Sequence, residues 1–406
     1  MSLASTLTNG SARAGAASTG AVASAASAHG SRITTIDTLR GLVMVIMLLD
    51  HVRETFYLHL QVTDPMTLPG TPPEVFFSRL AAHFCAPVFV FLTGLSAWLY
   101  ANPPGGTPRP VAGFLLKRGL LLIALELTLV NFAWSGTYNV LYLQVMWAIG
   151  FSMVVLALMS GLPRRVLVVV GLVIVCGHNA LAGIVVPPDS AWYLPWTLML
   201  HRGWALAEGA VRVRLTYPAL PWVGVILLGY AFAPVFSSKL DALTRRRVIA
   251  GTGVACLCVL LVLRGFNLYG ENLPWTPGAT GLETMMSWLN FTKYPPSLNF
   301  LLLTLGVGLL VLAGLEFIGN GLTRVLATFG GAPMFYYLLH LYVLLVSYRT
   351  LLAVFGPNQG TRFGADAGAF WIIWVVWLAM LPLLYLPVRA FVRYKRRSTQ
   401  AWVRYF

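Results

Sequence analysis

The sequence predicts an all-α polytopic integral membrane protein with about ten transmembrane helices and both termini in the cytoplasm. First, the chain is 58% hydrophobic and only 10% charged, whereas soluble domains carry about 25% charged residues. Second, apolar segments recur between residues 37 and 388, separated by polar or proline-bearing connections. Third, every second connection is short and basic, and the intervening ones hold most of the acidic residues and tryptophans. This alternation is typical of the positive-inside rule.

The first expected helices span residues 37–57, 80–100, 119–134 and 140–162. A polar, proline-bearing loop separates the first two, and a proline-glycine linker with Lys117 and Arg118 follows the second. The third ends at the turn 135–137, and the fourth runs into Pro163, which precedes two arginines. Glycine, proline and clustered polar residues are the usual breakers between helices.

The remaining expected helices span residues 166–186, 220–236, 248–263, 297–315, 334–355 and 370–388. Two long loops, 189–218 and 264–296, interrupt the series, and the first is rich in tryptophan. Such segments tend to lie at the bilayer interface. A Gly-Asn-Gly turn with Arg324 follows the helix at 297–315, and a basic cluster follows the last helix.

We expect the chain to divide into three parts. Residues 1–31 are mostly Ala, Ser, Gly and Thr, so they predict a disordered N-terminal tail that is neither a signal peptide nor a span. Residues 32–392 are expected to form a single transmembrane domain. Residues 393–406 are expected to form a basic cytoplasmic C-terminal tail.

The charge balance does not indicate nucleic-acid binding. The chain has 28 Lys and Arg against 13 Asp and Glu, a net charge of +15. Because the basic residues form short clusters between apolar segments, they fit membrane topology and we exclude nucleic acid as a partner. The four cysteines lie in apolar segments without zinc-type spacing, so we expect no metal site and no disulfide framework.

Residues 37–57, DTLRGLVMVIMLLDHVRETFY, are the most informative stretch. The apolar run at 41–49 is shorter than the roughly 20 residues that a span requires, so the helix must carry ionisable groups into the membrane. Each such group costs about 2.5–3.5 kcal/mol at the bilayer centre, and so usually faces a cavity. Helical spacing places Asp50, Arg53 and Glu54 on one face and His51 on the next. We expect a polar site at the outer end of this helix; the other interpretation is a helix that emerges into water.

His51 suits a role as general base, provided that an acidic partner orients its imidazole. Because neighbouring helical residues point about 100° apart, that carboxylate can be Glu54 or Asp64 rather than Asp50. Glu126 lies within an apolar helix, where we expect a structural ion pair with an arginine such as Arg118 or Arg40.

Three other polar residues have competing interpretations. His83 enters an apolar helix, where a hydrogen-bonded interface histidine is the commoner role. His340 lies mid-span in FYYLLHLYVLL, and the cost of insertion favours a position facing a cavity. Lys293, before Tyr-Pro-Pro, fits an interface anchor and a contact to an anionic substrate equally well.

Two segments, DTLRG at 37–41 and APVFVFLTG at 86–94, resemble the heparan-α-glucosaminide N-acetyltransferase family of membrane acyltransferases. Further segments are similar to the bacterial branch of that family: residues 49–53, 83–87, 217–224, 292–297 and 335–342. The likeness runs from about residue 32 to the C-terminus. It implies that residues 32–392 form an acyltransferase-like domain in a bacterial plasma (inner) membrane.

The resemblance also implies the reaction and its partners. An acetyl or acyl group would pass from cytoplasmic acetyl-CoA to a saccharide, amino sugar or glycolipid at the outer face. Membrane lipid is a further partner, and a homodimer is left open. The eukaryotic enzymes of the family use a histidine in the first outer loop, and His51, His59 and His83 are the candidates for its place here.

The predicted site residues fall into three groups. The catalytic candidates are His51, as base or acyl carrier, with Asp50, Glu54 and His83. The candidates for the CoA phosphates are Arg40, Arg118, Arg164 and Arg165. The candidates along the acceptor path are Arg53, Lys293, Tyr294 and His340. The rival hypothesis is a transporter or exporter of a small polar solute, whose intramembrane charges line a pathway.

Overall fold

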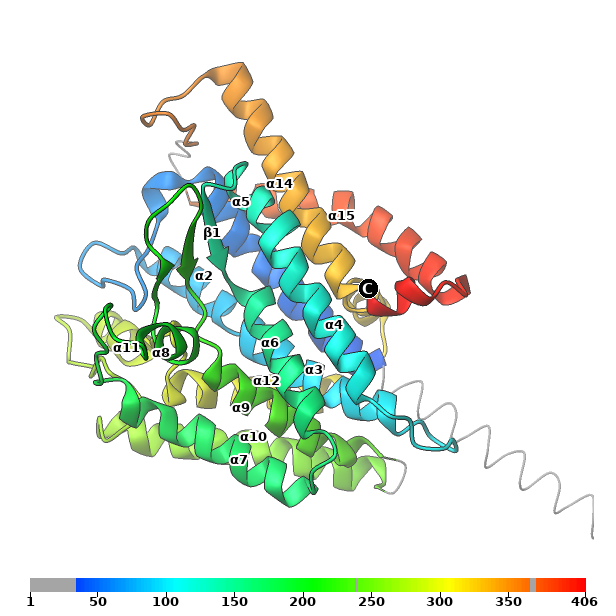
Figure 1. Cartoon of the computed structure of the whole chain (residues 1–406). Coiled ribbons are helices and arrows are strands. Elements are labelled where there is room, and N and C mark those ends of the chain that lie inside the picture. Colours follow the sequence, from blue (N-terminus) through cyan, green and yellow to red (C-terminus); the bar gives the residue numbers. More distant parts are fainter. Residues whose placement is uncertain (1–33, 238–239, 366–369) are drawn as a thin grey trace, which may run out of the picture.

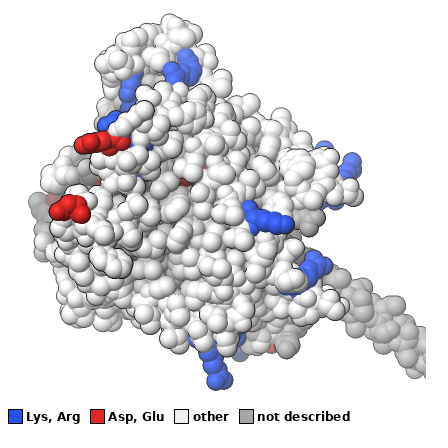
Figure 2. All heavy atoms as spheres, viewed as in Figure 1, with Lys and Arg blue, Asp and Glu red and all other residues white. Residues whose placement is uncertain are grey.

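The computed structural model describes residues 34–237, 240–365 and 370–406, and the tail predicted at 1–31 lies outside these residues. Helices dominate, as expected. Within the described residues, six are long and apolar enough to cross a membrane: Pro73–Ala101, Arg164–Leu181, Ala242–Gly265, Leu298–Leu315, Pro333–Phe355 and Trp371–Arg397. These helices expose many large apolar side chains, and the face seen in Figure 2 carries few charged groups. Such a surface suits contact with lipid.

The first helix covers residues 34–56. The elements that follow are η1 (Leu58–Leu60), α2 (Pro73–His83), α3 (Cys85–Ala101), α4 (Ala112–Leu125), η2 (Glu126–Val130), α5 (Asn131–Ser135), β1 (Val140–Leu143), α6 (Val145–Met159), α7 (Arg164–Gly177), η3 (His178–Leu181) and α8 (Tyr193–Met199). After these come β2 (Gly203–Leu206), β3 (Arg212–Leu215), α9 (Leu220–Phe232), η4 (Ala233–Phe236), α10 (Ala242–Gly265), α11 (Gly281–Leu289), α12 (Leu298–Leu315), α13 (Gly321–Gly330), α14 (Pro333–Phe355), α15 (Trp371–Arg397) and η5 (Ala401–Tyr405).

The second expected helix begins earlier than predicted. We expected it at residue 80, but α2 starts at Pro73, after an extended Pro72. Proline is favoured in the first turn of a helix because its missing N–H is not needed there. The polar side chains of this stretch, Glu74 and Arg79, resembled a loop in the sequence. Arg79 points into the protein and not toward lipid, and there it pairs with the Asp50 carboxylate, so this position does not need to be apolar.

A small sheet departs from the expected all-α fold. Its strand order is β1-β3-β2, with β1 parallel and β2 antiparallel to β3. The strand at 140–143 was predicted as the start of a helix because its residues, VLYL, are as apolar as the helix α6 that follows. Short helices α8, α11 and α13 were also not predicted. Figure 1 shows β1, α8 and α11 gathered at one end of the molecule.

The last helix also extends beyond its expected end. We placed that end at residue 388, but α15 continues through the basic cluster to Arg397. Its buried stripe includes Val388 and Val392, and the Phe391 ring stacks on Phe335 with centroids 4.2 Å apart. The boundary expected at 392/393 therefore falls inside a packed helix.

Close packing fixes the N-terminal part of the first helix. Gly41 lies against the backbone of Leu326, and Gly330 lies against the carbonyl of Asp37, with no room for a Cβ at either glycine. Small residues allow this approach of helix backbones in membrane proteins. The contact holds Asp37 and Arg40 at a defined position beside α13.

Candidate active site

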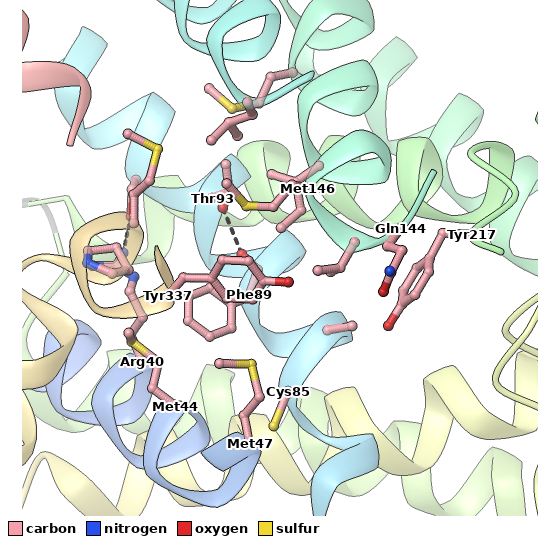
Figure 3. Close-up of a pocket in the computed structure, with 18 of the residues that line it drawn as sticks. Arg40, Met44, Met47, Cys85, Phe89, Thr93, Gln144, Met146, Tyr217 and Tyr337 are labelled. Atoms are coloured by element: carbon pink, nitrogen blue, oxygen red, sulfur yellow. Dashed lines mark hydrogen bonds between the residues drawn. The ribbon is translucent and has the colours of Figure 1, made fainter. Parts of the chain in front are cut away.

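A cavity of about 520 Å³ runs between the first helix, α3, α4, α6 and α14. Arg40 and His51, both from the first helix, line it, and a rise of 1.5 Å per residue separates them by about 16 Å along the axis. Figure 3 shows Arg40 on one side of the cavity and Tyr217 beside Gln144 on the other, with Phe89 and Tyr337 between them. The cavity thus has two polar ends joined by an apolar middle.

The basic end of the cavity is formed by Asp37, Arg40, Arg118 and Lys395. The guanidinium of Arg40 donates hydrogen bonds to Asp37 Oδ1 at 2.6 Å and to Ser96 Oγ at 2.8 Å. Lys395 Nζ donates to a backbone carbonyl, that of Gly331, at 3.2 Å. Three cations thus surround one carboxylate, and the basic end carries an excess of positive charge.

Two further features of the basic end suit a bound anion with an aromatic part. Nε of Arg118 is buried and has no hydrogen-bond partner among the residues that the structure describes. Tyr100 and Phe114 line the cavity and stack on each other, with ring centroids 4.5 Å apart. Such stacked rings offer a flat apolar surface beside the cations.

The histidine end of the cavity is lined by Asp50, His51, Glu54, Arg79 and Lys293. Arg53 Nη2 donates to Asp50 Oδ1 at 2.8 Å, and Arg79 Nη1 donates to Asp50 Oδ2 and to Glu54. The exposed fractions of Asp50, Arg53 and Arg79 are 5%, 2% and 6%. These groups form a buried ion network, in which each charge depends on its partners.

The network confirms the helical face predicted for Asp50, Arg53 and Glu54. It also binds both carboxylates to arginines, and in the described part of the chain neither accepts a hydrogen bond from His51. Asp64, the third candidate, accepts instead from the backbone N–H groups of Lys293 at 3.1 Å and Tyr294 at 2.8 Å. The expectation that a carboxylate orients the His51 imidazole is therefore wrong.

The partner of His51 is another histidine. Its Nδ1 lies 2.8 Å from Nε2 of His340, and Nδ1 of His340 lies 3.0 Å from the backbone carbonyl of Tyr336. The Trp134 ring packs edge-on against His51, with centroids 5.0 Å apart. His340 is fully buried, behind His51 as seen from the cavity.

Lys293 and Tyr294 reach the histidine end from the loop before α12. Both line the cavity, as does Tyr217, whose hydroxyl lies 3.1 Å from that of Tyr294. The Lys293 ammonium lies 5.1 Å from the centroid of the Tyr294 ring. Asp64 holds the backbone of both residues, and burial raises the pKa of its carboxyl. This loop therefore places one cation and two phenol groups beside His51.

Five predicted residues are not part of the cavity wall, and one of them is His340, which we expected to face a cavity but which lies buried behind His51. His83 is 1% exposed, packs against Phe300 and has no hydrogen-bond partner among the described residues. Arg53 pairs with Asp50 in the ion network and donates to the backbone carbonyl of Leu60. Arg164 donates to the carbonyl of Ala231 at 2.7 Å, and Arg165 is exposed at the start of α7.

Glu126 does not pair with an arginine as we expected. Its Oε2 accepts from the backbone N–H groups of Met146 at 2.8 Å and Trp147 at 3.1 Å. The first N–H groups of a helix have no partner within the helix, and Glu126 satisfies two of them at the start of α6. Its role is to hold α6 against the π-helical turn η2.

Several cavity residues were missed in the sequence, namely Lys395, Trp134, Gln144, Tyr217 and Tyr337. For Lys395 a signal was present. Leu384, Val388 and Val392 form a buried stripe at helical spacing, and Lys395 continues that stripe. Tyr217 lies in a loop, where no periodicity indicates which side chains turn inward.

The family model described as "Heparan-alpha-glucosaminide N-acetyltransferase, catalytic" matches residues 32–262, more than half of the 406 residues. No curated protein gives a significant match. The matched region contains the first helix, α3, α4 and α6, which form most of the cavity; Lys293, His340 and Lys395 lie beyond it. The chain therefore belongs to the heparan-α-glucosaminide N-acetyltransferase family of membrane acetyltransferases.

Proposed function

We propose that this protein transfers an acetyl or acyl group from acyl-CoA, with acetyl-CoA as the donor, to a saccharide or glycolipid acceptor across a bacterial inner membrane. The observation that carries the proposal is one continuous cavity with a cationic, aromatic end and a histidine end. An acyltransferase needs to hold an anionic donor and an acceptor so that they meet in one space.

We propose that the basic end faces the cytoplasm, in a chain of about ten membrane helices with both termini on that side. The CoA phosphates would then contact Arg40, Arg118 and Lys395, because guanidinium and ammonium groups form charge-assisted hydrogen bonds with phosphate. The unpartnered Nε of Arg118 and the stacked Tyr100 and Phe114 fit such a donor. Arg164 and Arg165 are left out because they do not line the cavity.

Acetyl-CoA, when bound, supplies an acyl thioester. We assign His51 the role of general base: it takes the proton from the acceptor amine or hydroxyl as that group attacks the acyl carbon. The C–S bond breaks, and the proton leaves with the thiol. Lys293 and Tyr294 would hold the acceptor at the histidine end, where their ammonium and hydroxyl groups can bind sugar oxygens. The buried network of Asp50, Arg79 and Glu54 would keep this end rigid.

The test is acyl transfer by purified full-length protein in lipid nanodiscs. Labelled acetyl-CoA is offered with a panel of amino sugars, neutral sugars and glycolipids, and labelled product is measured. His51→Ala should abolish transfer while acetyl-CoA still binds, because the basic end is unchanged. Transfer that survives His51→Ala would remove His51 from this role. A wild-type protein that binds no acetyl-CoA but moves a polar solute across liposomes would favour the rival hypothesis of a transporter.

A further inference from the structure

The hydrogen bonds around His340 define where its proton lies. Its Nδ1 lies 3.0 Å from the carbonyl oxygen of Tyr336, and a carbonyl can only accept. Nδ1 of His340 must therefore carry a hydrogen. In a neutral imidazole the other nitrogen is then an acceptor, so Nε2 of His340 receives a hydrogen bond from His51.

The same logic then applies to His51. Its Nδ1 is the atom 2.8 Å from Nε2 of His340, so Nδ1 must be the donor and carry the hydrogen. The two ring planes lie within 15° of parallel and their centroids are 5.1 Å apart. With one nitrogen of each ring only 2.8 Å from the other, the rings meet edge to edge, which is the arrangement of an in-plane hydrogen bond. This leaves Nε2 of His51 as its unprotonated nitrogen.

Both imidazoles are expected to be neutral in the resting protein. His340 is completely buried, and a buried cation without a counter-charge is costly. Around His51, the carboxylates of Asp50 and Glu54 are paired with Arg53 and Arg79, and Asp64 accepts from the backbone of Lys293 and Tyr294. Among the described residues, none of these carboxylates accepts a hydrogen bond from the histidine pair, so none is placed to offset a charge on it.

We propose that His340 is a positioning residue that fixes His51 in its Nδ1–H tautomer and thereby makes Nε2 of His51 the proton-accepting atom. The backbone carbonyl of Tyr336 anchors the chain of bonds, so no carboxylate is required. This inference rests on the proposed function for its consequence in catalysis. The tautomer itself is a property of the protein that holds whether or not the reaction is the one proposed.

The tautomer of His51 can be measured without an activity assay. Protein labelled with ¹⁵N-histidine and reconstituted in lipid is studied by solid-state NMR, with His51→Gln and His340→Gln used to assign signals. We expect protonated Nδ1 and unprotonated Nε2 for both residues. In His340→Leu, which cannot accept a hydrogen bond, the His51 signals should shift toward the Nε2–H tautomer. A wild-type His51 that carries its hydrogen on Nε2 would overturn the proposal.

Kinetics give a second, independent readout. Leu and Gln are similar in size, but the Gln side-chain oxygen can accept from His51 Nδ1–H near the position of the lost Nε2. We expect His340→Leu to lower kcat by about 10²-fold, the lower range for general-base catalysis, with little change in KM. His340→Gln should recover most of this loss. Equal kcat values for the two variants would contradict the positioning role.

The two measurements also separate failure of this inference from failure of the proposed function. If wild-type protein transfers no acyl group but shows the expected tautomers, the proposed function is wrong and the positioning role of His340 stands. If transfer occurs and His340→Leu leaves both kcat and the His51 signals unchanged, the inference alone is wrong. Acetyl-CoA binding by each variant verifies that it is folded, because the basic end does not involve His340.

Discussion

Removal of the two least paired cations at the basic end should weaken acetyl-CoA binding strongly. Within the described residues, Arg118 makes no hydrogen bond, and Lys395 has one partner, a backbone carbonyl. Their replacement should therefore cost the fold little. A hydrogen bond to a charged group contributes about 1.5–3 kcal/mol, and we take the lower value because both side chains are only partly buried. The variant Arg118→Gln/Lys395→Gln should lose about 3 kcal/mol, which weakens Kd roughly 150-fold.

The matched control is Arg164→Gln/Arg165→Gln. It also removes two positive charges, but from residues outside the cavity wall. We therefore expect Kd to change less than about 3-fold. Isothermal titration calorimetry with detergent-purified protein measures both. A repeat at about 1 M salt, where the Debye length is about 3 Å, separates contact from long-range attraction. If the control weakens binding as much as the test variant, or if the test variant binds normally, the assignment of the basic end is refuted.

Three further predictions concern stability, measured as the midpoint of thermal unfolding of the purified protein. Arg79→Leu should lose about 3 kcal/mol, because it removes one partner of the buried Asp50 carboxylate; a loss below about 1 kcal/mol would show that this network is well hydrated. Glu126→Leu should lose about 1–3 kcal/mol by leaving two helix N–H groups unpaired, whereas Glu126→Gln should lose less; equal losses would argue against this role. Burial raises the pKa of Asp64, so the folded chain holds this proton to a higher pH than the unfolded chain, and its contribution to stability falls as pH rises above about 4. The unfolding midpoint of wild type, relative to that of Asp64→Asn, should therefore fall as pH rises above about 4. A difference that stays constant with pH would contradict the raised pKa of Asp64.

Local spacing predicted those parts of the site that lie within one helix. Asp50 and Arg53 are three residues apart, so helical geometry alone brings them together. The partner of His51 is 289 residues away in the chain, and no pattern around His51 indicates it. An acidic neighbour was the reasonable expectation, because carboxylates commonly orient a catalytic imidazole. The arginines of α2 and the first helix bind both carboxylates, so the imidazole of His51 pairs with His340 of α14 instead.

The fold was predictable where a segment meets lipid and less so where it meets protein. α14, whose bounds were expected at 334–355, exposes Val346, Val354 and Phe355 and was located within one residue. α2 and the end of α15 are polar because they face the protein interior or the basic end, so their composition resembled loops. Strand β1 is apolar, but hydrophobicity alone does not distinguish a short strand from the start of a helix. Two of these errors, at α2 and at the end of α15, concern elements that line the cavity.

The geometry of the first helix also restricts the kind of donor that the proposed reaction can use. Gly41 against α13 fixes the position of Arg40, and the Asp50–Arg79 pair fixes the position of His51. The two functional groups are thus held about 16 Å apart along one rigid helix. A compact donor such as an acyl phosphate has its phosphate next to its reactive carbon, and so cannot occupy both ends at once. A donor whose phosphates are joined to the acyl group by a long, narrow arm can do so through the apolar middle of the cavity, and CoA thioesters have this form.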